Sequence, residues 1–242
     1  MIHEKIEAPA VNGRGLPRAA RLSAVAMLSL LAAYLLSPAL TPVHPEGFTA
    51  SVASLGIHLR NGSLADFDTI QPLNVEFFGL SKLGWVLLTS ALTGLGLSAF
   101  AAMTLLTWLA AAAFGTGTVL LVRRWTAAPV WAIAATLMLF QGVTETAFFF
   151  NDNIIASAFA VWGILALYLE RRILGAALCG ALFGAAVLTR SDTILISPAA
   201  LLVLLERHRS WRPVAEALAV AGAVGSAILF GILAAFNATV FD

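Results

Sequence analysis

Long apolar runs alternate with short polar clusters along almost the whole chain, after a polar stretch at residues 1–21. An upright helix needs about 20 apolar residues to cross the hydrocarbon core of a bilayer, and shorter runs cross when their polar ends snorkel or the bilayer thins. This pattern predicts about seven membrane-spanning helices. They cover residues 22–40, 97–122, 127–143, 154–169, 173–188, 194–205 and 214–236.

One further segment, "FFGLSKLGWVLLTSALTGLG" at residues 77–96, is apolar enough to cross but carries Lys82, four glycines and several hydroxyls. The distribution of Lys and Arg residues decides whether this segment crosses the membrane or lies on its surface. If it lies on the membrane surface, 11 of the 14 Lys and Arg residues are cytoplasmic, and Arg60, Lys82 and Arg190 lie outside. If it crosses, only five remain inside. The positive-inside rule therefore predicts an interfacial juxtamembrane helix, with Thr89 and Thr93 on its polar face.

This topology gives a simple domain organisation. Residues 1–21 form a cytoplasmic tail, and residues 22–242 form a single polytopic membrane domain whose first external loop is 41–96. The run 22–40 exceeds the apolar core of a cleaved signal peptide, which has about 7–15 residues, so we expect a retained span.

Composition agrees with an all-α membrane protein. The chain is 60% hydrophobic and 11% charged, whereas soluble domains are about 45–50% apolar and 25% charged. A net charge of +1 gives no overall field to recruit nucleic acid. The single Cys179 excludes a disulfide framework and a cysteine zinc site.

Two further patterns indicate structural roles. The small residues of "GALFG" at residues 180–184, with Ala221 and Gly225, predict close helix packing. Four tryptophans near the proposed interfaces are typical of an aromatic belt, namely Trp85, Trp125, Trp131 and Trp211.

The stretch "FFFNDNII" at residues 148–155 places Asp152 at an external membrane boundary, where the helix 154–169 begins. Two interpretations stay open there. Asn151 or Asp152 caps the helix, because a side-chain oxygen accepts from free backbone N–H groups and negative charge suits the helix dipole. The same fixed carboxylate is also suited to a catalytic site.

Four segments share an order along the chain with a known membrane module. They are "NGSLADFDTIQPLNVEFFGLSKLG", "LLVRRWTAAPVWAIAATLMLF", "FFFNDNIIASAFAVWGILALYLERR" and "LGAALCGALFGAAVLTRSDTILISPAALLVLLE". In this order they resemble the conserved membrane module of the GT-C superfamily, which comprises integral glycosyltransferases that use polyprenyl-phosphate-linked sugars. The family usually continues into further spans, so the resemblance covers only the seven-span module, over residues 22–236.

The resemblance implies sugar transfer with inversion at the extracytoplasmic face. Such a reaction needs a carboxylate base for the acceptor proton and a cation for the departing phosphate. The candidate acids are Asp66, Asp68 and Asp152, and ordinary loop acids are the alternative for the first two. The family leaves a divalent metal open, and no other cofactor is expected.

The candidate phosphate-binding cations are Arg190, Lys82 and Arg60. Arg190 lies on the side where positive charge is scarce, and a guanidinium suits phosphate oxygens. A local pair with Asp192 explains Arg190 equally well, and solvated loop charge explains the other two.

The sequence thus predicts a glycosyltransferase of a bacterial inner membrane with a cytoplasmic N-terminus. Its partners would be a polyprenyl-phosphate-linked sugar and membrane lipids. The alternative is a non-catalytic GT-C-like scaffold or partner subunit. A transporter is less favoured, because charged residues gather at span ends rather than at mid-membrane.

Overall fold

The computed structural model describes residues 47–62, 82–126, 128–139, 152–208 and 210–241. All regular structure in these ranges is helical. The elements are α2 (Gly47–Asn61), α5 (Leu83–Gly94), α6 (Ala99–Trp125), α7 (Val130–Leu139), α9 (Asp152–Ala166), α10 (Arg172–Thr189), the 3-10 helix η1 (Ser191–Ile196), α11 (Ser197–Arg207) and α12 (Trp211–Phe241).

Three of these helices are long and apolar enough to cross a membrane, namely α6, α10 and α12. They correspond to three of the spans predicted from the sequence, and the predicted span 22–40 lies outside the described residues. The helices α9 and α11 are shorter than their predicted spans. At 1.5 Å per residue, the 11 residues of α11 reach about 16 Å, roughly half of the hydrocarbon thickness.

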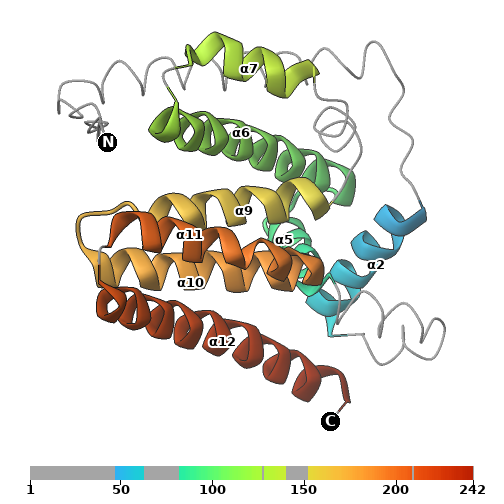
Figure 1. The fold of residues 1–242 in the computed structure, drawn as a ribbon. Helices are drawn as coiled ribbons and strands as arrows, with labels where there is room; N and C mark the ends of the chain where they lie inside the picture. Colours follow the sequence, from blue (N-terminus) through green and yellow to red (C-terminus); the bar gives the residue numbers. More distant parts are fainter. Residues whose placement is uncertain (1–46, 63–81, 127, 140–151, 209, 242) are drawn as a thin grey trace, which may run out of the picture.

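The helices α6, α9, α10 and α12 pack in that order, each against the next, and α7 packs on α6 (Figure 1). The helices α6 and α9 run in the same direction. Trp162 of α9 donates a hydrogen bond to the Ala113 carbonyl in the middle of α6, and Trp125 at the end of α6 bonds Tyr168, just beyond α9. The next helix, α10, then returns antiparallel.

Small residues let the backbones of α10 and α12 touch, as the sequence pattern predicted. A methyl group at Gly184 would lie 2.9 Å from the Gly225 carbonyl oxygen, and one at Gly180 would overlap the Ala221 carbonyl. No side chain larger than hydrogen fits at these two positions of α10. The interpretation of "GALFG" as a helix-packing motif is confirmed.

The segment 41–96, predicted as the first external loop, contains a helix that was not among the predicted elements. In α2, Val52, Leu55 and Leu59 follow at intervals of three and four residues, so they share one face, and this face packs in the same apolar core as Leu83 and Val86 of α5. Such spacing is the usual signal of an amphipathic helix.

The helix α5 forms within the segment where a juxtamembrane helix was predicted, but its polar face does not point to solvent. Thr89 and Thr93 are buried, together with Leu83, Trp85 and Val86. The expected orientation was therefore wrong at both threonines. Both threonines are covered because α5 packs against α2, α6 and α10, which surround it with protein on several sides.

Arginines gather at the bundle end opposite the α5 terminus that carries Lys82. There Arg172 pairs with Glu216 at 2.5 Å, Arg207 donates to the Leu167 carbonyl, and Trp125 bonds Glu206 at 3.1 Å. The ends of α6, α9, α10, α11 and α12 therefore meet here. We call this region the arginine end.

Candidate functional site

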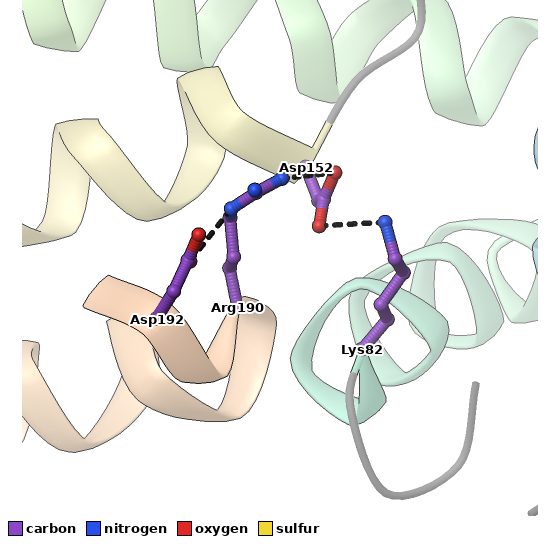
Figure 2. Close-up of polar contacts among 4 residues, drawn as sticks. All are labelled: Lys82, Asp152, Arg190 and Asp192. Atoms are coloured by element: carbon purple, nitrogen blue, oxygen red, sulfur yellow. Dashed lines mark hydrogen bonds and ion pairs between the residues drawn. The ribbon is translucent and has the colours of Figure 1, made fainter. Parts of the chain in front are cut away.

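Three segments that are distant in the sequence meet at one carboxylate (Figure 2). Lys82 precedes α5, Asp152 begins α9, and Arg190 follows α10. The Lys82 Nζ lies 2.9 Å from one oxygen of Asp152, and the Arg190 Nη1 lies 3.7 Å from the other. Arg190 also donates from Nε to Asp192 at 2.6 Å. We call these four residues the ion cluster.

Glycine at position 84 brings Lys82 to this place. A methyl group there would lie 2.5 Å from the Thr189 hydroxyl oxygen and 2.8 Å from the Thr189 nitrogen. The first turn of α5 therefore lies directly against the last residue of α10. Because Arg190 is the next residue, this close contact carries Lys82 to the same side of the bundle as the guanidinium.

The end of α10 sets the direction of Arg190. The Thr189 hydroxyl donates to the Ala185 carbonyl within the helix, and the backbone then becomes extended at Arg190, with φ −157° and ψ 112°. The chain turns at once into η1, where the Thr193 nitrogen donates to the Arg190 carbonyl at 3.1 Å. Arg190 and Asp192 are thereby held on one tight corner.

Asp152 is the most buried member of the ion cluster, with 4% of its side chain exposed, against 20% for Lys82. A carboxylate so removed from water is costly unless it is paired, and here both oxygens face a cation. Its place in the first turn of α9 adds a favourable interaction with the helix dipole. The hydrogen bond that the Arg190 guanidinium donates to the Asp192 carboxylate raises the pKa of Arg190, so the guanidinium stays charged.

These contacts bear on the two interpretations of Asp152. The contacts described for its carboxylate are to Lys82 and Arg190, and within the described residues no backbone N–H donates to it. Capping by Asp152 is therefore not seen, and Asn151 lies outside the described residues. For Arg190, the local pair with Asp192 and the contact with a second carboxylate both occur.

A small polar cavity of about 200 Å³ lies beside Arg190. Its walls come from α9 and from the corner after α10. Ligand sites for drug-sized molecules run to roughly 300–1,000 Å³, so this cavity suits a headgroup rather than a whole lipid. The lining residues are Asn153, Ala156, Ser157, Arg190, Asp192, Thr193 and Ile196.

Trp85 belongs to this region, although its sequence position indicated a place in an interfacial aromatic belt. The residue is buried in the core, and its ring centroid lies 5.9 Å from the Lys82 Nζ. At that distance the ring face attracts the ammonium group. Because Trp85 is buried, its assignment to an interfacial aromatic belt was wrong. Its position three residues after Lys82 places the two side chains on the same face of a helix, and this spacing could have indicated their contact.

The structure does not bring Arg60 to the ion cluster. Its Nη1 donates to the Thr93 carbonyl at 2.8 Å and its Nε to Asn61 at 3.1 Å. Thr93 and Lys82 are at opposite ends of α5, about 16 Å apart along the helix axis. Arg60 therefore holds α2 against the far end of α5.

Two predicted acids, Asp66 and Asp68, lie outside the described residues. Among the residues that are described, no group of three or more His, Cys, Asp or Glu side chains could hold a metal ion.

No protein family, curated protein or solved structure matches this chain.

Proposed function

We propose that the protein is a membrane glycosyltransferase of the GT-C type, which moves a sugar from a polyprenyl-phosphate donor to an acceptor at the extracytoplasmic face. One observation carries the proposal. Two cations from separate segments, Lys82 and Arg190, converge on Asp152, and Arg190 also lines a polar cavity. A departing phosphate needs such a pair, because fixed positive charge stabilises the negative charge that develops on it.

The position of the cavity supports a lipid-linked donor. On the other side of η1, an apolar cavity of about 280 Å³ lies between α10, α11 and α12 and includes Ile194. Thr193 lines the polar cavity and is the preceding residue. A phosphate at Arg190 would therefore have an apolar surface within reach for the first isoprene units of its tail.

The proposed roles follow from these contacts. Lys82 and Arg190 bind the donor phosphate, and Asp152 holds both cations in position. Asp66 or Asp68 is the base that takes the acceptor proton. The proposal also includes seven spans, a cytoplasmic N-terminus and a bacterial inner membrane, because these place the ion cluster on the side where the sugar transfer occurs.

The test measures sugar transfer in isolated membranes with a polyprenyl-phosphate donor, after lipid mass spectrometry of the purified protein has identified the copurifying prenyl glycan. Asp66→Asn or Asp68→Asn should lower the rate by about 10²–10⁴-fold, the usual contribution of a general base. Glu170→Gln is the matched control, since Glu170 is an exposed acid at the arginine end. Normal rates in both single variants and in the double variant would exclude the proposed base.

A second candidate function is a non-catalytic partner subunit of a larger membrane complex. The observation in its favour concerns α12. Only 6% of the most apolar 18-residue stretch of this helix is buried inside the structure, so most of its surface is left for lipid or for another protein. Copurification with a partner at fixed stoichiometry, together with no bound prenyl lipid, would support this function over transfer.

A further inference from the structure

The arginine end contains a second cavity, which the proposed transfer reaction does not use. Its volume is about 600 Å³, and it is open to the outside of the bundle. Its walls come from the turn between α9 and α10 and from the end of α11. The lining residues are Glu170, Arg171, Arg172, Ile173, Leu174, Arg207 and His208.

Positive charge exceeds negative charge in this lining, with three arginines against Glu170. Two arginines are engaged, because Arg172 pairs with Glu216 at 2.5 Å and Arg207 donates to the Leu167 carbonyl. Within the described part of the chain, no hydrogen bond or ion pair engages the side chain of Arg171. Its five N–H donors are available to a ligand.

Two further polar groups at the cavity make no hydrogen bond within the part of the chain that the structure describes. The His208 Nε2 is buried and makes no hydrogen bond to the described residues. The first turn of α10 begins here, and its cap residue, Arg171, makes no side-chain capping bond. Free backbone N–H groups at the start of an 18-residue helix favour an anion. A buried imidazole nitrogen and uncapped amides thus lie beside an unpaired guanidinium.

The cavity also has an aliphatic wall. Ile173 and Leu174 line it and are each about half exposed. Large apolar side chains beside arginines form an amphipathic surface, which suits a phosphate together with the glycerol and upper acyl region of a lipid. Basic pockets at the ends of membrane helices bind anionic lipid headgroups in this way.

We propose that this cavity at the arginine end binds a phosphate-bearing anion, with Arg171, His208 and the first turn of α10 as its ligands. The headgroup phosphate of an anionic phospholipid and a soluble phosphate share this chemistry. The aliphatic wall favours the phospholipid. The inference is independent of the proposed transfer reaction, because it concerns the opposite end of the bundle.

Native mass spectrometry of the full chain in detergent tests the proposal with three probes: phosphatidylglycerol, phosphatidylcholine and inorganic phosphate. We expect the protein to bind phosphatidylglycerol in preference to phosphatidylcholine. Arg171→Gln should weaken phosphatidylglycerol binding by about tenfold, since it removes one charge-assisted contact, and Arg171→Lys should retain part of the affinity. Binding of phosphatidylcholine should stay unchanged.

The matched control is Arg123→Gln, which removes the same charge from an exposed residue beyond the lining of the cavity. If Arg123→Gln weakens binding as much as Arg171→Gln, the attraction is diffuse and the cavity is not a site. Equal binding by Arg171→Gln and the unchanged protein would also overturn the proposal. If Arg171→Gln weakens the binding of inorganic phosphate but not that of phosphatidylglycerol, the anion site is supported and its ligand is a soluble phosphate.

Discussion

Removal of the Lys82 ammonium group should destabilise the protein more than any exposed charge does. The perturbation is Lys82→Met, which keeps much of the aliphatic stem that packs near Trp85 but removes the charge. Among the described residues, the Arg190 guanidinium, 3.7 Å away, would then be the cation left beside Asp152. Its side chain is 4% exposed, so water cannot replace the lost partner.

The magnitude follows from the cost of breaking a buried ion pair. Removal of one partner costs about 3–5 kcal/mol when the other charge is left uncompensated. Arg190 remains as a second cation and Lys82 is 20% exposed, so we expect a loss near the lower limit, about 3 kcal/mol. Asp152→Asn in the Lys82→Met background should recover at least about 1 kcal/mol, because the two residues are directly coupled.

The assay is the free energy of unfolding, measured by denaturant titration in mixed micelles for the two single variants and the double variant. Arg212→Met is the matched control. Arg212 pairs with Glu216 at 3.2 Å, but its side chain is 91% exposed, and such a pair contributes at most about 1 kcal/mol. Glu216 also keeps Arg172 as a partner.

Two results would refute this reasoning. A loss in Lys82→Met no greater than that in Arg212→Met would mean that Asp152 does not depend on the ammonium group. Strictly additive effects of the Lys82 and Asp152 substitutions would mean that their contact carries no coupling energy, whatever the size of the single losses.

Two other variants test the packing and the electrostatics. Gly84→Ala should lower the free energy of unfolding by about 1–3 kcal/mol, because the new methyl group overpacks against Thr189. Gly222→Ala is the control: its methyl group meets nothing within 4 Å, so stability should be equal or up to about 1 kcal/mol higher. Equal losses in the two variants would contradict the close contact at Gly84. Partial burial, followed by the nearby positive charges of Arg207 and Arg172, lowers the pKa of His208 below 6.5. As the pH drops below 6.5, the unfolded chain therefore takes up the proton before the folded protein does, and the free energy of unfolding should fall. The pH dependence of unfolding should be shallower in His208→Gln over that window, and an unchanged slope would contradict the shift.

Much of the helical arrangement follows from the sequence because its causes are local. Apolar runs predicted α6, α10 and α12, and the small residues Gly180 and Gly184 predicted close contact with another helix. The separation of the arginines from Lys82 and Arg190 also followed from the order of spans. These features depend on which residues are near one another in the chain.

The meeting of Lys82 with Asp152 depends on a contact that no local pattern specifies. Gly84 is one of several glycines in its segment, and nothing in the sequence shows that it touches Thr189. The apolar runs likewise could not show that α5 is surrounded by protein, so Thr89 was expected at the surface. Both outcomes are decided by helix packing.

The length of helix α10 sets the distance between the ion cluster and the arginine end. Its 18 residues span about 27 Å, close to the roughly 30 Å hydrocarbon thickness of a bilayer. Arg171 precedes this helix and Arg190 follows it. Since the backbone of α10 touches that of α12, the distance between the Cα atoms of Arg171 and Arg190 is fixed, and the two residues mark the ends of a helix that matches the bilayer in length.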